Sequence, residues 1–346
     1  MTKSLCELGW KPFFQQQLTE NEMESCIPVR ITAHHRSQIV TESDHGEQAF
    51  AIALLNKLAP ITVGDWLLID QLSMRPVRLL ERQSLLQRKA AGEYVDQQLM
   101  AANIDTLLIV SSCNQEFNLS RLERYLSIAL EAGVMAIVVL TKADLAEDVE
   151  PYREQVKKLR AGLIVESINA FDQSTLSGVL AWCHTGQTLA MLGSSGVGKS
   201  TLATALGAAE QTTSTIREDD QKGRHTTTWR SLLHLAHGGI LIDNPGIREL
   251  QLTACEEGVN ELFSDVLDYA NCRYANCSHT NEPGCNVRKA IETDQLDKRR
   301  LVNYQKLLAE QQRNSESLSD KRKRMKQLGK SYKSIQTASR QRKNRS

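Results

Sequence analysis

One glycine-rich segment constrains this chain more than any other. It reads GSSGVGKS, directly follows the apolar stretch TLAML (188–192) and directly precedes a helical pattern of Leu202, Ala205 and Leu206. That is the phosphate-binding loop in its strand-loop-helix context. Its glycines let successive backbone N–H groups surround phosphates at a helix N-terminus. The sequence therefore predicts an α/β nucleotide-binding domain that contacts nucleotide through Gly193, Ser194, Ser195, Gly196, Val197, Gly198, Lys199, Ser200 and Thr201.

The same loop predicts a magnesium nucleotide site. Lys199 is expected to bridge the β- and γ-phosphates, and the Ser200 hydroxyl is expected to bind Mg²⁺. Asp243 ends an apolar strand at 239–242, which suits a water-mediated magnesium contact, and the Gly246 amide that follows suits the γ-phosphate. One threonine of 226–228, in the hydroxyl-rich stretch GRHTTT, is expected to complete the magnesium shell; the sequence does not say which, and Thr227 is taken as the candidate. A simple turn at 243–246 and a β-prone edge at 226–228 remain the alternatives.

A second short motif indicates which base is bound. The segment TKAD follows the apolar stretch MAIVVL, and an aspartate placed there accepts both guanine N1–H and N2–H, a paired contact that adenine cannot make. The alternative is an ATP-using protein in which TKAD is incidental. A backbone amide from 168–170 is expected near guanine O6. The predicted base contacts are Thr141, Lys142, Ala143 and Asp144.

The order of these motifs is unusual, because the base-recognition segment at 141–144 precedes the phosphate loop at 193–200. Most regulatory GTPases have the opposite order. The same sheet neighbours are kept if the chain is cut in one surface loop and rejoined at another. We therefore expect a circularly permuted GTPase domain.

Three cysteines and a histidine fall within 14 residues near the C-terminus. Three thiolates and one imidazole form a tetrahedral set that suits a closed structural zinc site, with no open position for substrate. A disulfide pair is the weaker alternative, since it leaves one thiol and the histidine unexplained. The predicted zinc ligands are Cys272, Cys277, His279 and Cys285.

The 346 residues carry a net charge of only +1, but the charge is unevenly placed. Residues 313–346 hold 12 Lys or Arg against two acids, which gives +10 there and −9 elsewhere. Such a tail suits a polyanion, and a merely solvated terminus is an equally open interpretation. No apolar run approaches the ~20 residues of a membrane span, and no secretion signal is found, so we expect a cytoplasmic protein. The expected oligomeric state is a monomer.

Short strands expected at 29–32, 37–41, 49–54 and 61–70, the last one broken at 64–65, suggest a small N-terminal β-barrel. The chain resembles the bacterial RsgA family of small ribosomal subunit biogenesis GTPases. The resemblance rests on TKAD, GSSGVGKST, GRHTTT, DNPG and the cysteine cluster, together with VGDW (63–66) and ANID (102–105). The resemblance covers roughly residues 28–310. It implies a multidomain protein: an extension (1–27), an OB-fold RNA-binding barrel (28–82), a circularly permuted α/β P-loop G domain (96–252), a zinc-binding α-helical domain (253–312) and a basic tail (313–346).

The resemblance also implies GTP hydrolysis to GDP in late maturation of the small ribosomal subunit, stimulated by the particle, with rRNA as a partner. Thr141 departs from the Asn usual in the family, and Asn244 from the usual Thr. Ile247 stands where many GTPases have the glutamine that orients water, so His225 is the candidate for positioning it; the alternative is an imidazole that only pairs electrostatically with the phosphates. The alternative function is a zinc-containing RNA-binding protein with a regulatory, weakly hydrolytic nucleotide site.

Overall fold

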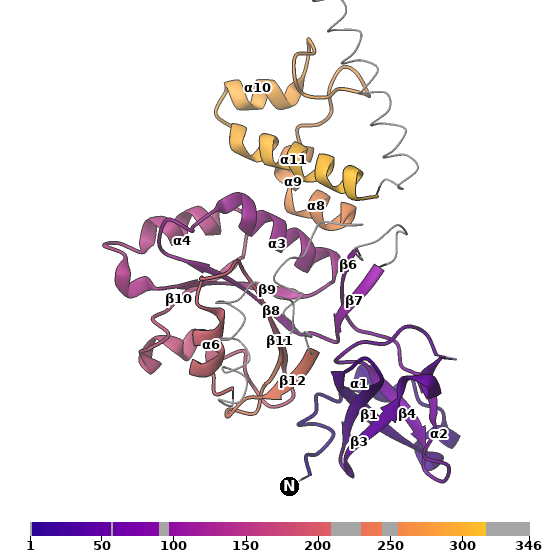
Figure 1. The fold of residues 1–346 in the computed structure, drawn as a ribbon. Coiled ribbons are helices and arrows are strands. Elements are labelled where there is room, and N and C mark those ends of the chain that lie inside the picture. Colours follow the sequence, from indigo (N-terminus) through magenta and orange to yellow (C-terminus); the bar gives the residue numbers. More distant parts are fainter. Residues whose placement is uncertain (1, 57, 90–96, 209–229, 244–254, 316–346) are drawn as a thin grey trace, which may run out of the picture.

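The computed structural model describes residues 2–56, 58–89, 97–208, 230–243 and 255–315 (Figure 1). The N-terminal part holds two short helices and five antiparallel strands. Trp10 and Phe14 pack their rings on Trp66, so residues 2–25 cover one side of the strands. The elements are α1 (Pro12–Gln15), α2 (Glu20–Ser25), β1 (Cys26–His34), β2 (Gln38–Ser43), β3 (Gly46–Ala51), η1 (Ile52–Leu55), β4 (Trp66–Asp70) and β5 (Pro76–Leu79).

The five strands form the expected small barrel around an apolar interior that includes Val29, Ile39 and Leu67. One detail differs from the sequence prediction. Residues 52–55 form the 3₁₀ helix η1 instead of extending a strand, and the backbone N–H of Ile52 donates to the carbonyl of Ser37. The expected break at 64–65 is present, because Gly64 has a φ of +91° and β4 begins only at Trp66.

The central sheet is the α/β sheet that the motifs predicted. Its strands β10, β9, β8, β11 and β13 lie in that order and are parallel, and β12 closes the row in antiparallel pairing with β13. Strand β11 leads into the phosphate loop and lies in the middle, with strands from earlier in the chain on one side. The strands are β8 (Thr106–Ser112), β9 (Met135–Thr141), β10 (Ile164–Ser167), β11 (Thr188–Leu192), β12 (Arg230–His234) and β13 (Ile240–Asp243).

Both faces of this sheet are covered, which explains its continuous apolar runs. In β8, Leu107 and Ile109 face the core beneath α3, whereas Leu108 and Val110 face the core beneath α6. Figure 1 shows α3 and α4 on one face and α6 on the other. The covering elements are α3 (Leu119–Glu131), η2 (Ala143–Leu145), α4 (Glu150–Lys157), η3 (Gln173–Leu176), α5 (Ser177–Leu180) and α6 (Lys199–Ala205).

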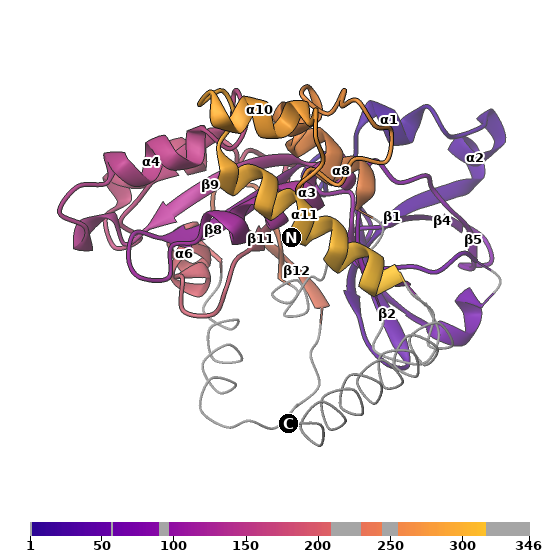
Figure 2. The ribbon, with the colours of Figure 1, turned by 90° about the horizontal axis from the view of Figure 1, so that it is seen from above.

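A helical C-terminal module (residues 255–315) packs on α3 (Figures 1 and 2). The N–H of Gly258 donates to the Glu131 carboxylate at 2.8 Å, which fixes the start of the module against the end of α3. Its helices are α8 (Glu256–Leu262), α9 (Ser264–Leu267), α10 (Asn286–Glu292) and α11 (Lys298–Ser315). None of the helices in the described ranges has the length and apolar character of a membrane span.

Two further features lie at the junction of the barrel with the central sheet. Strand β1 pairs with β12, with Ala33 opposite Ser231, so barrel and α/β strands form one continuous hydrogen-bonded sheet. Between the two regions, β6 (Leu85–Lys89) and β7 (Gln97–Ala102) form a separate hairpin that the sequence had not indicated.

Candidate functional site

The phosphate loop lies between β11 and α6, at the carboxyl edge of the sheet. A side chain at Gly193 would place its Cβ 2.4 Å from the Val110 carbonyl oxygen, so only glycine fits beside β8. Gly196 and Gly198 have φ values of +78° and +92°, the left-handed region that glycine adopts without strain. Helix α6 then begins at Lys199, directing its first N–H groups toward the loop.

The base-recognition segment contacts this loop directly. The Thr141 hydroxyl donates to the Val197 carbonyl at 2.6 Å, and Lys142 Nζ donates to the Gly196 carbonyl at 2.9 Å. Thr141 is buried at the end of β9, whereas Asp144 is exposed in η2. Two segments that are more than 50 positions apart, in reversed order, thus meet at one edge of the sheet.

The loop at 168–171 lies beside the base-recognition segment. The Ala143 N–H donates to the Ile168 carbonyl at 3.2 Å, and the Ile168 N–H donates to the Leu140 carbonyl at 2.8 Å. The Asn169 side chain accepts from the N–H of Phe171 at 3.0 Å, which shapes the turn. The predicted second base contact is therefore next to the first.

The phosphate loop is also held from within. Lys199 Nζ lies 2.8 Å from the Gly193 carbonyl oxygen and 2.5 Å from that of Ser194. These bonds satisfy ammonium donors that the sequence assigns to nucleotide phosphates. Ser200 and Thr201 follow in the first turn of α6 and are half-buried.

The switch residues are described only in part. Asp243 is the last residue of β13, which runs parallel to β11 with Ala190 opposite Ile242. Because the ends of neighbouring parallel strands meet at one edge, the backbone of Asp243 lies at the same edge as the phosphate loop. His225, Thr227 and Gly246 lie outside the described residues.

The four predicted zinc ligands come together in the C-terminal module. Their donor atoms all lie within 4.8 Å of one another. The Sγ atoms of Cys272 and Cys285 are 3.8 Å apart, and each lies 3.5 Å from Nδ1 of His279. Zn–S bonds of about 2.3 Å and Zn–N bonds of about 2.0 Å in a tetrahedron require donor separations of about 3.8 Å and 3.5 Å. Cys272, Cys277, His279 and Cys285 therefore form a cluster that fits a metal ion.

The motifs VGDW and ANID meet at the junction of the barrel with the G domain. The Asn103 side chain donates to the Gly64 carbonyl at 2.9 Å, and a Cβ on Gly64 would lie 2.1 Å from the Ala102 carbonyl oxygen. The Asp105 carboxylate accepts from the N–H of Thr188, the first residue of β11, at 2.8 Å. Sequence reasoning gave these motifs no role, because their partners are distant in the chain.

Buried charges fill the same junction. Arg30 in β1 donates to the Thr188 hydroxyl at 2.8 Å and to the Leu8 carbonyl at 2.6 Å. Burial lowers the pKa of Arg30 to about 10, since desolvation disfavours the charged guanidinium. Burial also raises the pKa of Asp65, although Arg82 binds both of its carboxylate oxygens and opposes that shift. The strand that feeds the phosphate loop is therefore tied to the barrel through paired polar groups.

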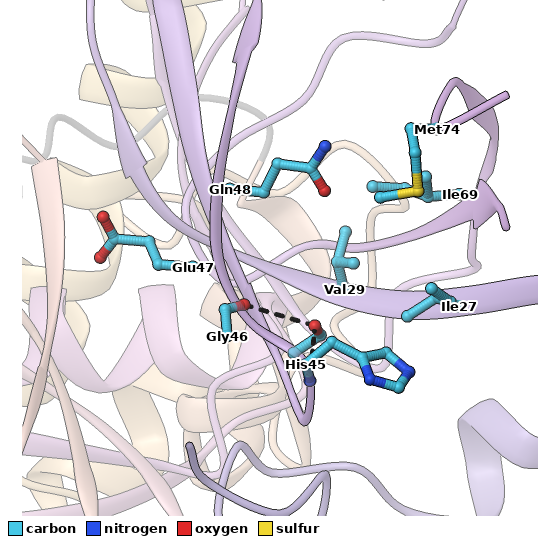
Figure 3. A pocket seen from close by; sticks show the side chains of 9 residues that line it. Ile27, Val29, His45, Gly46, Glu47, Gln48, Ile69 and Met74 are labelled. Atoms are coloured by element: carbon cyan, nitrogen blue, oxygen red, sulfur yellow. Dashed lines mark hydrogen bonds between the residues drawn. The ribbon is translucent and has the colours of Figure 1, made fainter. Parts of the chain in front are cut away.

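The barrel has a pocket of its own (Figure 3). It lies at the β2–β3 turn and has a floor of aliphatic side chains that includes Val29 and Ile69. The Ser43 hydroxyl donates to the Gly46 carbonyl at 3.3 Å and accepts from the His45 N–H at 3.1 Å, which closes the turn. Its lining residues differ from those of the nucleotide loops and of the metal cluster.

Comparisons with known proteins agree with this arrangement. The model of the RsgA GTPase family matches residues 79–253. The chain is 50% identical to "Small ribosomal subunit biogenesis GTPase RsgA 2" of Vibrio parahaemolyticus, over 98% of this chain and 94% of that protein. It is 44% identical to "Small ribosomal subunit biogenesis GTPase RsgA" of Mesorhizobium japonicum, over 90% and 91%.

Two solved structures share the fold. The crystal structure of YjeQ from Thermotoga maritima aligns with a TM-score of 0.60 at 22% identity, over 82% of this chain and 98% of that one. YloQ, described as a circularly permuted GTPase, aligns with a TM-score of 0.57 at 23% identity, over 86% and 99%. The predicted permuted fold is thereby confirmed. The family match and the two sequence relatives show that this chain belongs to the RsgA GTPase family.

Proposed function

We propose that this chain hydrolyses GTP to GDP and phosphate and acts in late maturation of the small ribosomal subunit, whose particle stimulates its turnover. Membership in the RsgA GTPase family and the names of its relatives support this function. The single structural observation that carries it is the pair of hydrogen bonds from Thr141 and Lys142 to the phosphate loop. They join a guanine-selecting segment to a phosphate-binding segment in one site.

In the proposed site, Lys199 binds the β- and γ-phosphates, and the backbone N–H groups of residues 193–201 surround them. Asp144 accepts from guanine N1–H and N2–H. Mg²⁺ accompanies GTP and is held by Ser200, Thr227 and Asp243. The Gly246 amide faces the γ-phosphate, and His225 helps to position the attacking water.

The metal cluster holds one structural Zn²⁺ in this proposal. Its donor set of three sulfurs and one nitrogen fits zinc and leaves no position for a substrate. The ion stabilises the turn between α9 and α10, where Cys285 also caps α10 by accepting from the Arg288 N–H. Zinc here supports the fold of the C-terminal module, and hydrolysis takes place at the other site.

The small ribosomal subunit and its rRNA are the proposed partners of a monomeric cytoplasmic protein. The barrel and the basic tail bind rRNA phosphates with little sequence dependence. GTP orders residues 223–228 and 243–247, this state binds the particle, and hydrolysis releases it. We assign the domains as 1–27, 28–82, 96–252, 253–312 and 313–346.

The deciding experiment measures phosphate release from GTP and from ATP, with and without purified small subunits, at several salt concentrations. We expect slow hydrolysis that is specific for GTP and strongly stimulated by the particle, and stimulation that weakens as salt rises. Lys199→Ala serves as the control without phosphate binding. A particle that binds without stimulating hydrolysis would favour the RNA-binding module with a regulatory nucleotide site.

A further inference from the structure

The phosphate loop receives a hydrogen bond from helix α3 that the predicted site does not include. Nη1 of Arg121, in the first turn of α3, donates to the Ser194 hydroxyl at 2.8 Å. Ser194 is the second residue of the loop. The N–H of Arg121 donates to the Asn118 side chain at 3.0 Å, so the N-cap of α3 fixes the backbone that carries the guanidinium.

The positive charge of Arg121 stays available beside the loop. A hydroxyl partner does not neutralise a guanidinium. In the described part of the chain, Arg121 pairs with the carboxylate of Glu116, which lies 3.8 Å away with a side chain that is 56% exposed, where solvent weakens the attraction. Nη1 of Arg121 makes the hydrogen bond to Ser194. As far as the described residues show, the remaining N–H groups of the guanidinium can bind a further partner.

The helix that carries Arg121 is also fixed from its other side. Glu123, two residues further along α3, is fully buried and accepts from Arg299 at 2.9 Å and from Arg300 at 2.6 Å. Both arginines lie in α11. Arg300 is held in turn by Asp265 at 2.7 Å and by the carbonyl of Leu262. Helix α3 therefore connects the phosphate loop, through Arg121, to the C-terminal module, through Glu123. The two side chains lie two residues apart and point to different sides of the helix.

We propose that Arg121 is a positioning residue for GTP hydrolysis. Arg121 holds the first part of the phosphate loop through Ser194. Because α3 is bound to the C-terminal module through Glu123, a shift of that module also shifts Arg121 and this part of the loop. The proposal rests on the proposed GTPase function. Ile247 replaces the usual water-orienting glutamine, so turnover depends more heavily on the placement of the loop. A misplacement of 1 Å can cost about 100-fold in rate.

The test compares steady-state GTP hydrolysis by the native full-length chain and by Arg121→Ala. We expect kcat to fall roughly 10- to 100-fold while KM for GTP changes less than about threefold, because loop placement matters most in the transition state. Arg121→Lys should recover part of the loss, since the lysine ammonium can also donate to the Ser194 hydroxyl. Arg78→Ala is the control, because Arg78 joins β5 to α2 through Glu22, at 2.6 Å, within the barrel and away from the nucleotide loops.

A double-variant comparison separates positioning from other roles. If Arg121 acts through Ser194, then Ser194→Ala lowers kcat to a similar extent, and the double variant is no slower than the slower single variant. Reductions in kcat that multiply in the double variant would overturn the proposal, and so would an unchanged kcat with a lowered melting temperature, or an equal reduction in Arg78→Ala. Absence of stimulation by small subunits in the native chain would instead contradict the proposed function, and intrinsic turnover would still report on Arg121.

Discussion

At the scale of single residues, the hydroxyl of Thr141 joins the two halves of the nucleotide site. Thr141 stands where the resemblance to the family leads us to expect asparagine, and it donates to the Val197 carbonyl at 2.6 Å while also lying 3.2 Å from the Ser111 carbonyl oxygen. Thr141 therefore supplies a contact between the base-recognition segment and the phosphate loop. In the proposed site, base selection rests on Asp144.

Asp144→Asn should remove the preference for GTP. An amide cannot accept both guanine N–H groups, and a site built around such a pair loses at least about 100-fold in affinity when the pairing fails. Binding of GTP and of ATP, measured by displacement of a fluorescent nucleotide, checks this. Unchanged selectivity would mean that TKAD does not read the base.

Gly64→Ala should destabilise the folded chain by at least about 2 kcal/mol, because it combines a positive φ with a Cβ 2.1 Å from the Ala102 carbonyl oxygen. Gly133→Ala is the matched control, since its φ is +64° and nothing lies within 4 Å of its added Cβ. That change should cost only about 1 kcal/mol. Urea unfolding of both variants separates the clash from the backbone strain.

At the scale of elements, strands and loops differ in how well the sequence predicts them. Strands β8, β9 and β11 were predictable because both of their faces are buried, which leaves continuous apolar runs. The sequence did not predict the packing of α1 on Trp66 or the roles of VGDW and ANID, because these depend on residues far away in the chain. The phosphate loop, the base segment and the metal cluster were found because each is local, whereas Arg121 carries no local signature.

The contact of β2 with β12 should depend on pH. Glu42 accepts from His234 Nε2 at 2.9 Å, and this bond is the main cause that lowers the pKa of Glu42 from 4.5 to about 2. A lowered acid pKa stabilises the fold above pH 4.5, and this contribution disappears as the pH falls from 4.5 toward 2. We expect Glu42→Gln to cost on the order of 2 kcal/mol at pH 7.

Urea unfolding of the native chain and of Glu42→Gln at several pH values checks this prediction. The difference between the two unfolding free energies should shrink below pH 4.5 as the native carboxylate becomes protonated. A difference that stays constant down to pH 3 would show that the carboxylate charge contributes nothing. Glu47→Gln, on the neighbouring strand β3, controls for removal of an acid from the barrel.

Cys272→Ala should release zinc and loosen the C-terminal module, because three remaining donors no longer close the tetrahedron. GTP affinity should stay within about threefold of the native value, as a structural site acts on the local fold. Metal content by mass spectrometry and nucleotide titration measure the two effects, with the exposed Cys6→Ala as control. A loss of GTP affinity equal to that of Lys199→Ala would show that the sites are not separable.

At the scale of the whole molecule, opposite charges are separated along the chain, with +10 in residues 313–346 and −9 elsewhere. Truncation after Ser315 keeps the described helix α11 (Lys298–Ser315) and its contacts with Glu123. We expect the truncated chain to bind small subunits more weakly. The slope of log affinity against log salt should fall by about 0.7 to 0.9 for each rRNA phosphate that the chain no longer neutralises.

Filter binding of native and truncated chains to purified small subunits, over a series of salt concentrations, measures both quantities. GTP affinity in the absence of particles serves as the control and should not change, because the truncation leaves the phosphate loop and α3 intact. Equal affinity and equal salt slope for the two chains would assign rRNA binding to the barrel alone.

The pairing of β1 with β12 also bears on solubility. A terminal strand of an open sheet offers unpaired amide and carbonyl groups to any passing chain, which promotes aggregation. Here the barrel pairs with the first two residues of this edge, with His34 opposite Arg230 and Ala33 opposite Ser231. We expect a fragment cut down to the nucleotide-binding region to lack this protection and to aggregate more readily than the full chain.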